Sequence, residues 1–349
     1  MRIDGYAHVV PPAYLAQVIE QGDATSNLVG TWIRHGPLTE SPGSRLRLLD
    51  AYDMDVQIVT PPVPPVDVVA AASGLDVEQL VRTFNDGLYE WVSQQPDRYR
   101  AVGTVSLRAL DHAIEEVERM ATELRFIGVQ LCCGPDLPPL EAAELERFYA
   151  RVDELGLGIW IHPFESPRKA AAAGGIASAR EQAPYILGWP YHTTLAVFCV
   201  AAAGITERYP DLPWILHHAG GLTPLLAPRI ETFYTSNWSA VTGLNAAGTS
   251  NVVEALKSFY VDTAAGGSTL AVSAAIGFFG ADHVIFGTDA PFGERGGSDV
   301  VERALASVQA ISADPAAQSA VMAQNLINLF GPGLRLNPAG RSRRSEGPR

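Results

Sequence analysis

Positive charge, cysteine and long apolar runs are all scarce in this chain of 349 residues. Its 25 lysines and arginines are outnumbered by 38 aspartates and glutamates, which gives a net charge of −13 and a pI of about 5.0. A chain this acidic is not expected to bind nucleic acid or an anionic membrane surface. The most apolar run, residues 194–205, is shorter than the about 20 residues that cross a bilayer, and the first residues lack the apolar stretch of a secretory signal. We expect a cytoplasmic protein with no membrane partner.

Cysteine occurs only at Cys132, Cys133 and Cys199. The number is odd, two of the three are adjacent, and all lie in apolar surroundings, so buried reduced thiols are expected rather than a disulfide framework. The sequence also lacks a glycine-rich dinucleotide fingerprint after a strand, so no organic cofactor is implied.

Apolar residues make up 47% of the chain and charged residues 18%, enough for a large core. Strand-like runs alternate with stretches of helical periodicity such as residues 76–94 and 110–124. The eight runs span residues 2–10, 56–60, 101–106, 127–131, 157–162, 214–218, 259–262 and 283–287. Eight alternating strands and helices predict a single α/β domain, a (β/α)8 barrel over residues 1–336.

Two long intervals interrupt this alternation, residues 14–42 and 165–189. Both follow strands that end in candidate site residues, so we expect insertions over the C-terminal mouth of the barrel. The tail, residues 337–349, has four arginines and one glutamate, which gives it a charge of +3 and leaves −16 on residues 1–336. Its composition predicts disorder.

His8, His162, His218 and Asp289 each lie at the C-terminal end of a predicted strand. The C-terminal ends of barrel strands converge on one mouth, so these side chains should meet in one pocket. Imidazoles and a carboxylate in one pocket indicate a metal-dependent lyase or hydrolase.

The motifs around these residues resemble the amidohydrolase-related decarboxylases, the family of aminocarboxymuconate-semialdehyde, resorcylate and carboxyvanillate decarboxylases. The resemblance covers residues 1 to about 331. It rests on Ile3-Asp-Gly-Tyr-Ala-His8-Val-Val-Pro11, Asn85-Asp with Gln95-Pro-Asp-Arg-Tyr99, Ile161-His-Pro163, His218-Ala-Gly-Gly-Leu-Thr-Pro224, and Phe286-Gly-Thr-Asp-Ala-Pro-Phe292. It implies a distorted barrel of the amidohydrolase type.

The resemblance implies that His8, His162 and Asp289 bind one divalent metal ion. Zinc is the expected ion, with manganese as the alternative. Tyr6 departs from the family pattern, which has His or Glu at this position. Strand alternation points residues 6 and 8 to the same side. Three interpretations stay open: Tyr6 ligates as a phenolate, it hydrogen-bonds a water on the metal, or the metal site is lost.

His218 matches the family's general base, and His217 before it is expected to face the helix layer. Arg229 matches an arginine that reaches a neighbouring subunit's site and pairs with the substrate carboxylate, which implies a homodimer. Arg47 is a second candidate for that carboxylate. Trp189 is a candidate for stacking on a planar substrate, with a packing role as the alternative.

The resemblance favours non-oxidative decarboxylation of an aromatic or conjugated unsaturated carboxylic acid, a small-molecule substrate. Asp289, or a water activated by His218, would supply the proton to the carbon that loses CO2. The same strand-end residues also suit a hydrolase or hydratase that uses a metal-bound water. Tyr6 motivates a third hypothesis, a metal-free relative that only binds a ligand or catalyses a proton transfer.

Overall fold

A computed structural model describes residues 1–21, 36–165, 183–235, 249, 251–311, 314–331 and 334 of the chain. Seven parallel strands pair in chain order to form one curved sheet. They are β1 (Ile3–His8), β2 (Val56–Thr60), β3 (Tyr99–Thr104), β4 (Gly128–Cys133), β5 (Gly158–Pro163), β6 (Trp214–Leu216) and β7 (Tyr260–Val261). Each corresponds to one of the first seven predicted strands.

The eighth predicted strand, residues 283–287, closes the barrel without forming a regular ladder. One parallel bridge joins Val284 to Val261 of β7, and a second joins Ala290 to Ala7 of β1. Between them, Gly5 of β1 donates its backbone N–H to the carbonyl of residue 286 at 2.7 Å. The fold is a distorted (β/α)8 barrel, as predicted, and its irregular closing segment leads directly into Asp289.

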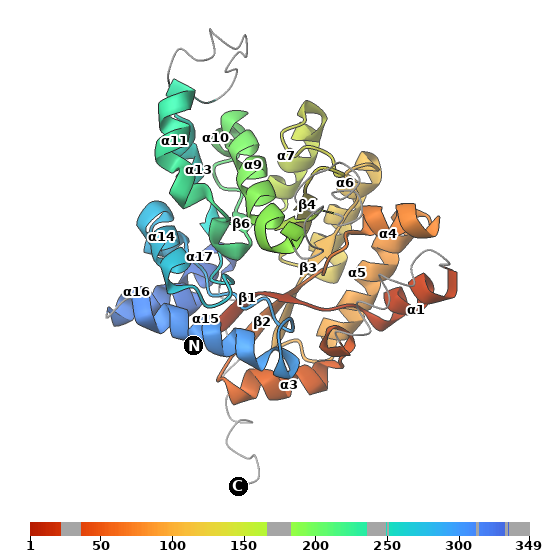
Figure 1. Cartoon of the computed structure of the whole chain (residues 1–349). Helices are drawn as coiled ribbons and strands as arrows, with labels where there is room; N and C mark the ends of the chain where they lie inside the picture. The colour runs from red at the N-terminus through yellow and green to blue at the C-terminus, as the bar shows by residue number, and fades with distance from the viewer. Residues whose placement is uncertain are drawn as a thin grey trace.

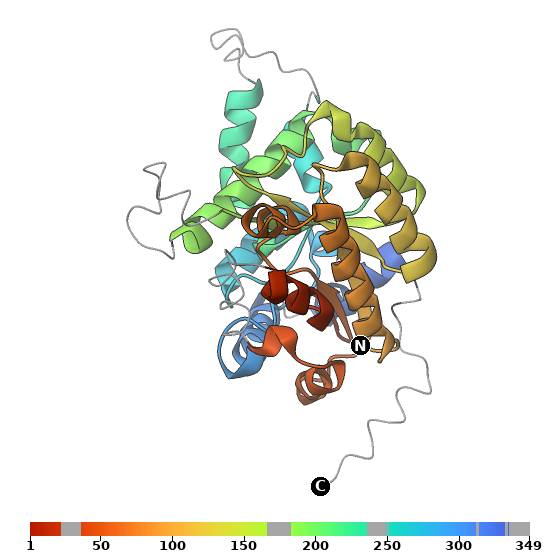
Figure 2. The ribbon, with the colours of Figure 1, turned by 90° about the vertical axis from the view of Figure 1, so that its right-hand side faces the viewer.

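Helices surround the strands in both views of the molecule (Figures 1 and 2). They are α1 (Pro12–Gln21), α3 (Pro42–Ala51), α4 (Val66–Ser73), α5 (Val77–Ser93), α6 (Leu110–Arg119), α7 (Glu146–Glu154), α9 (Trp189–Ala202), α10 (Ile205–Arg208), α11 (Thr223–Thr235), α13 (Val252–Lys257), α14 (Thr269–Phe279), α15 (Ser298–Ile311), α16 (Pro315–Ser319) and α17 (Asn325–Phe330). Tyr52, which caps the end of α3, donates its hydroxyl to Glu302 of α15 at 2.7 Å, so the last helices adjoin the first.

The predicted helices over residues 76–94 and 110–124 correspond to α5 and to α6 with the following turn, η2 (Met120–Leu124). Helix α5 begins where it does because the carboxylate of Asp76 accepts the backbone N–H of Gln79 at 2.8 Å, which satisfies one of the helix's unpaired donors. Its apolar positions, including Leu80, Phe84 and Leu88, are buried against the sheet.

The core has two layers, one between the sheet and the helices and one inside the barrel. Inside, Trp160 of β5 crosses the interior and donates its indole N–H to the carbonyl of Gly5 at 3.2 Å. Its ring stacks on Phe330 of α17 with centroids 5.3 Å apart. Phe330 also lies against Gly158, the first residue of β5. Helix α17 therefore closes the end of the barrel where the strands begin, and leaves the opposite mouth for the site.

The first predicted insertion begins as a helix. Helix α1 is followed, after a gap in the described residues, by the short turn η1 (Gly36–Thr39). Tyr14 of α1 is buried and packs edge-on against Phe84 of α5 with ring centroids 5.1 Å apart. Residues 22–35 and 166–182 of the two insertions lie outside the described residues, as does the tail predicted to be disordered, residues 337–349.

No helix in the described part of the chain is long and apolar enough to cross a membrane. The cytoplasmic location stays a prediction. All three cysteines are free thiols, as predicted. Cys133 is buried, whereas Cys132 and Cys199 are only partly buried.

Asp4 links three parts of the barrel wall. Its buried carboxylate accepts the side-chain amide of Gln57 on β2 at 2.9 Å. From the closing segment it accepts the hydroxyl of Thr288 at 2.7 Å and the backbone N–H of the same residue at 3.0 Å. Burial raises the pKa of Asp4 to about 6, although these hydrogen bonds oppose the rise.

This raised pKa predicts that the contribution of Asp4 to the stability of the metal-free protein falls as pH rises from about 4 to 6. In that range the unfolded chain has already released the proton of Asp4, whereas the folded chain still holds it. This contribution to the free energy of unfolding should fall by about 1.4 kcal/mol per unit of pKa difference, a few kcal/mol at most. Urea unfolding at several pH values measures the slope. Asp4→Asn should remove the contribution of Asp4, so that stability rises more with pH in the variant than in the unmodified protein, and identical slopes would show that Asp4 contributes none.

Candidate active site

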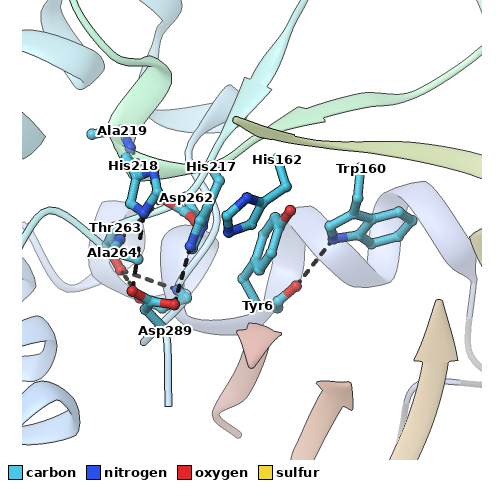
Figure 3. Close-up of polar contacts among 12 residues, drawn as sticks. Tyr6, Trp160, His162, His217, His218, Ala219, Asp262, Thr263, Ala264 and Asp289 are labelled. Atoms are coloured by element: carbon cyan, nitrogen blue, oxygen red, sulfur yellow. Dashed lines mark hydrogen bonds and ion pairs between the residues drawn. The ribbon is translucent and has the colours of Figure 1, made fainter. Parts of the chain in front are cut away.

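Four histidines and one aspartate from different strands meet at the mouth of the barrel. Figure 3 shows His162, His217, His218 and Asp289 among them. His8 ends β1, His162 lies in β5, His217 and His218 follow β6, and Asp289 follows the closing segment. The ring centroids of His8, His162 and His217 lie 5.1 to 5.8 Å apart. Asp289 Oδ1 lies 3.1 Å from His8 Nε2 and 3.3 Å from His217 Nε2. The structure brings together the four residues predicted to meet and adds His217.

The backbone is strained where two of these residues lie. His218 has φ 59° and Asp289 has φ 65°, a left-handed conformation that is uncommon outside glycine and that concentrates at functional sites. The turn after His218 also needs Gly221, since a β-carbon there would lie 2.5 Å from the carbonyl oxygen of Pro190 and 2.9 Å from the hydroxyl of Thr194. The His218-Ala-Gly-Gly motif is thus a tight turn pressed onto α9, and it directs His218 into the mouth.

Each of three buried imidazoles has its Nδ1 held by an oxygen acceptor. His8 Nδ1 lies 3.0 Å from the carbonyl oxygen of Pro61, and His162 Nδ1 lies 2.7 Å from the carbonyl of the following residue. His217 Nδ1 contacts the carboxylate of Asp262. Because these oxygens only accept, each Nδ1 carries a proton, and the neutral ring keeps its lone pair on Nε2. Rings fixed in this way are typical of metal sites.

The prediction that His217 faces the helix layer is wrong. It assumed that β6 continues through His218 with alternating side chains. The strand ends at Leu216, and an extended His217 (φ −77°, ψ 159°) is followed by a left-handed His218. The alternation is broken there, so both imidazoles face the mouth, with ring centroids 3.8 Å apart.

Asp262, which the sequence reasoning did not single out, holds His217 in place. It is fully buried directly after β7. One carboxylate oxygen accepts the N–H of His217, and the other accepts the backbone N–H groups of Ala219 at 3.1 Å and Ala264 at 3.0 Å. A signal was available, because Asp262 is the last residue of the predicted strand 259–262, the position that marked the other site residues.

The cluster holds its members in different charge states. Burial and the neighbouring imidazoles hold the pKa of His162 well below 6.5, and burial with His217 lowers the pKa of His218 to about 3. Burial also acts to lower the pKa of His217, but Asp262 and Asp289 outweigh it and raise the value to about 9. Burial acts to raise the pKa of Asp289, but contact with His217 outweighs it and holds the value well below 3.8. Near pH 7 and without a cation, His162 and His218 are neutral, whereas His217 is protonated beside the ionised Asp289.

Tyr6 packs within the cluster but directs its hydroxyl elsewhere (Figure 3). Its ring stacks on His217 with centroids 3.8 Å apart. The hydroxyl donates to Gln130 Oε1 at 3.1 Å and lies 3.4 Å from the carbonyl oxygen of Ile161. Burial, with the charge of Asp262, holds the pKa of the phenol well above 10. The geometry therefore disfavours phenolate ligation, and it ties the hydroxyl to β4 and β5 rather than to a water on a metal.

Tyr6→Phe is accordingly expected to keep bound metal. The phenyl ring preserves the stack on His217, whereas Gln130 loses a buried hydrogen bond, so the free energy of unfolding should fall by about 1–3 kcal/mol. Elemental analysis gives the metal content, and urea unfolding gives the stability. Loss of metal from a folded Tyr6→Phe protein would instead show that the phenol is a ligand.

Aromatic rings flank the histidines. Trp189, the first residue of α9, lies 5.3 Å from His162 and stacks on His218 at 5.9 Å, measured between ring centroids. The ring centroid of Phe292 lies 5.4 Å from that of His8. Trp189 therefore lies beside the cluster, and its stacking on a substrate stays a prediction. These rings provide flat apolar walls beside the polar groups.

The arginines proposed to bind substrate lie elsewhere. Arg47 is exposed on α3 and donates to the hydroxyl of Ser44 at 2.8 Å, so the structure does not bring it to the cluster. Arg45, the buried arginine of α3, is engaged by Gln57, Glu40 and two backbone carbonyls. Arg229 is exposed on α11, with its guanidinium 4.7 Å from the ring centroid of Phe233. Among the described residues, the guanidinium of Arg45 reaches the cluster only at the backbone carbonyl of His8, at 3.1 Å, and neither Arg47 nor Arg229 contacts it.

The cluster fits a divalent cation. In the described residues, the Nε2 atoms of His8 and His217 are buried and lack a hydrogen bond of proper alignment, although both face an oxygen of Asp289. One ligand atom each of His8, His162 and His217 lies within 4.8 Å of the others, and so do those of His217, His218 and Asp289. A nitrogen lone pair and a carboxylate oxygen repel each other unless a positive charge lies between them. That charge is either a proton on His217 or a metal cation. Imidazole and carboxylate ligands suit Zn²⁺ and Mn²⁺.

The sequence matches the family model of amidohydrolases, Amidohydro_2, over residues 3–331. The chain belongs to this family. Among its curated relatives, 2-amino-3-carboxymuconate-6-semialdehyde decarboxylase of Dictyostelium discoideum is 26% identical over 251 residues, which cover 72% of this chain and 67% of the relative. Gamma-resorcylate decarboxylase of Polaromonas sp. is 28% identical over 260 residues, which cover 71% of this chain and 76% of the relative.

Solved structures confirm the fold. 5-Carboxyvanillate decarboxylase of Sphingomonas paucimobilis aligns with a TM-score of 0.78 at 19% identity, over 94% of this chain and 98% of that one. A dihydroxybenzoic acid decarboxylase of Polaromonas sp. JS666, solved with manganese and the inhibitor 2-nitroresorcinol, aligns with a TM-score of 0.74 at 21% identity, over 94% and 96%.

Proposed function

We propose that this protein is a metal-dependent carboxy-lyase that removes CO2 without oxidation from an aromatic or conjugated unsaturated carboxylic acid. The observation that carries the proposal is the cluster of His8, His162, His218 and Asp289 at one barrel mouth, in a chain whose similar proteins are decarboxylases of such acids. The aromatic walls formed by Trp189 and Phe292 suit a flat substrate.

In this proposal, His8, His162 and Asp289 hold the metal. Manganese is the better supported ion, because similar decarboxylases were solved with it, and the preference for zinc stays a prediction. Bound there, a divalent cation would supply Lewis-acid attraction for the substrate's oxygens and fix the orientation of its carboxylate.

Decarboxylation consumes one proton at the carbon that loses CO2, and His218 is placed to deliver it. Its side chain is 18% exposed, whereas those of His8 and His217 are fully buried, so it faces the space that a substrate would enter. A neutral His218 can take a proton from water or a substrate hydroxyl and pass it to that carbon. Asp289, whose pKa is held low, stays ionised. Its Oδ2 lies 4.0 Å from His218 Nε2 and would stabilise the imidazolium.

We further propose a homodimer in which Arg229 pairs with the substrate carboxylate in the neighbouring subunit's site. An exposed apolar face surrounds Arg229 on α11 and continues onto the adjacent η5 (Pro184–Gly188) and α9, where Phe198 contacts Tyr234 of α11. Its large exposed side chains are Tyr185, Ile186, Leu187, Tyr191, Leu195, Leu225 and Phe233. Exposed apolar side chains that gather on neighbouring helices are typical of a protein interface.

A screen for CO2 release tests the proposed activity. Dihydroxybenzoic acids and a carboxyvanillate serve as probes, with benzoate as a control that lacks ring hydroxyls. Each acid is incubated with metal-free protein and with protein supplied with Mn²⁺ or Zn²⁺, and both CO2 and the decarboxylated product are measured.

We expect metal-dependent release from at least one hydroxylated acid and none from His218→Ala protein. Release that the His218→Ala protein matches would remove His218 from the reaction. Ester or amide hydrolysis without CO2 release would favour the hydrolase alternative. Activity that survives chelation would favour the metal-free alternative.

A further inference from the structure

We infer that His217 is a metal ligand in this protein and takes the coordination position that Tyr6 leaves unfilled. The inference rests on the proposed function, because it concerns the same metal. The family pattern places His or Glu at position 6, but the hydroxyl of Tyr6 is engaged by Gln130. The stacked ring of His217 lies directly beside Tyr6, with centroids 3.8 Å apart.

The position of His217 is that of a ligand. Its ring centroid lies 5.1 Å from that of His162 and 5.8 Å from that of His8, comparable with the 5.4 Å between those two. A ligand atom from each of the three lies within 4.8 Å of the others. His217 Nε2 is buried, has no aligned hydrogen bond in the described part of the chain, and lies 3.3 Å from Asp289 Oδ1.

The orientation of His217 is fixed in the way that metal-binding histidines are fixed. Its Nδ1 donates to Asp262, a carboxylate that is fully buried and anchored by the backbone N–H groups of Ala219 and Ala264. A carboxylate on one ring nitrogen sets the tautomer and makes the other nitrogen a stronger ligand.

The adjacent His218 has a different environment, which divides the work between the two residues. His218 is partly exposed at the mouth, stacks on Trp189, and lies 4.0 Å from the second oxygen of Asp289. His217 is fully enclosed by protein and unsuited to contact substrate. We therefore assign metal binding to His217 and proton transfer to His218.

Mn²⁺ titration of the full chain distinguishes the neighbours, because the electron paramagnetic resonance of free Mn²⁺ is lost on binding. His217→Ala should raise the dissociation constant by more than the about 10–100-fold that loss of an outer partner causes, and Asp262→Asn should raise it within that range. His218→Ala, the matched control, should leave it nearly unchanged. Circular dichroism of the metal-free proteins confirms folding, and if His217→Ala does not fold, Asp262→Asn and the nitrogen count below decide.

Pulsed electron paramagnetic resonance counts the imidazole nitrogens coupled to Mn²⁺. We expect three in the unmodified protein and in His218→Ala, and two in His217→Ala. The double variant Tyr6→His with His217→Ala should regain three, because the new imidazole enters at the position where the family pattern has a ligand, and should recover affinity.

Two coupled imidazoles in the unmodified protein, or unchanged affinity in folded His217→Ala, would overturn only the assignment of His217 as a ligand. Failure of the unmodified protein to bind Mn²⁺ would overturn it together with the metal site of the proposed function. Binding as described without CO2 release from any acid would leave His217 as a ligand and overturn only the decarboxylase.

Discussion

Replacing His162 with alanine is expected to abolish both metal binding and turnover. His162 lies at the centre of the cluster, with ring contacts to His8, His217 and His218. Its pKa is held well below 6.5, so its lone pair is available at neutral pH and no proton has to be displaced when a cation binds. Loss of this ligand should raise the dissociation constant of Mn²⁺ by more than the about 10–100-fold seen when an outer partner is lost.

Elemental analysis after supply of Mn²⁺ and removal of free metal checks this result. We expect about one ion per chain before the change and almost none after it. The control is His112→Ala, which removes a buried histidine on α6, where it accepts from Arg82 at 3.3 Å. His112→Ala should keep its metal. If His162→Ala retains a full complement of metal and its activity, the metal site is not where we place it.

The fold could be predicted because its signals are local. Apolar runs identify the seven strands of the sheet, and helical periodicity identifies helices such as α5, which matches residues 76–94. The exception is the closing segment, where Val284 and Ala290 make isolated bridges in place of a ladder. The barrel is closed there by Asp4, whose hydrogen bonds to Thr288 come from 284 residues away and are invisible to any local pattern.

The site was predicted in part for the same reason. Strand ends indicated His8, His162, His218 and Asp289, because strand direction alone places them at one mouth. The side chain of His217 was predicted on the wrong face because side chains alternate between faces only within a strand. Strand β6 ends one residue before His217. The direction of the Tyr6 hydroxyl depends on Gln130, a contact across three strands that the spacing of residues 6 and 8 cannot reveal.

Arg229→Ala is expected to impair the reaction without loss of metal. The anionic substrate needs a positive partner, yet within one chain Arg47 contacts Ser44, Arg45 is engaged elsewhere, and Arg229 lies exposed within an apolar face. If the face is an interface, Arg229 completes the partner's pocket and forms a two-pronged contact with the carboxylate. Truncation of one member of such a buried pair costs about 2–5 kcal/mol. Arg229→Lys should recover only part of this, since an ammonium lacks the planar fork.

Mixed dimers test the sharing directly. In a dimer of one Arg229→Ala subunit and one His218→Ala subunit, the pocket that retains His218 receives Arg229 from its partner and is intact, whereas the other pocket lacks both. Random mixing of two inactive proteins should therefore restore about a quarter of the original activity, because half of the dimers are mixed and each has one intact pocket. Sedimentation establishes the dimer, and differently tagged subunits isolate the mixed form. No recovery in isolated mixed dimers, or full activity in a monomer, would place the carboxylate's partner within the same chain.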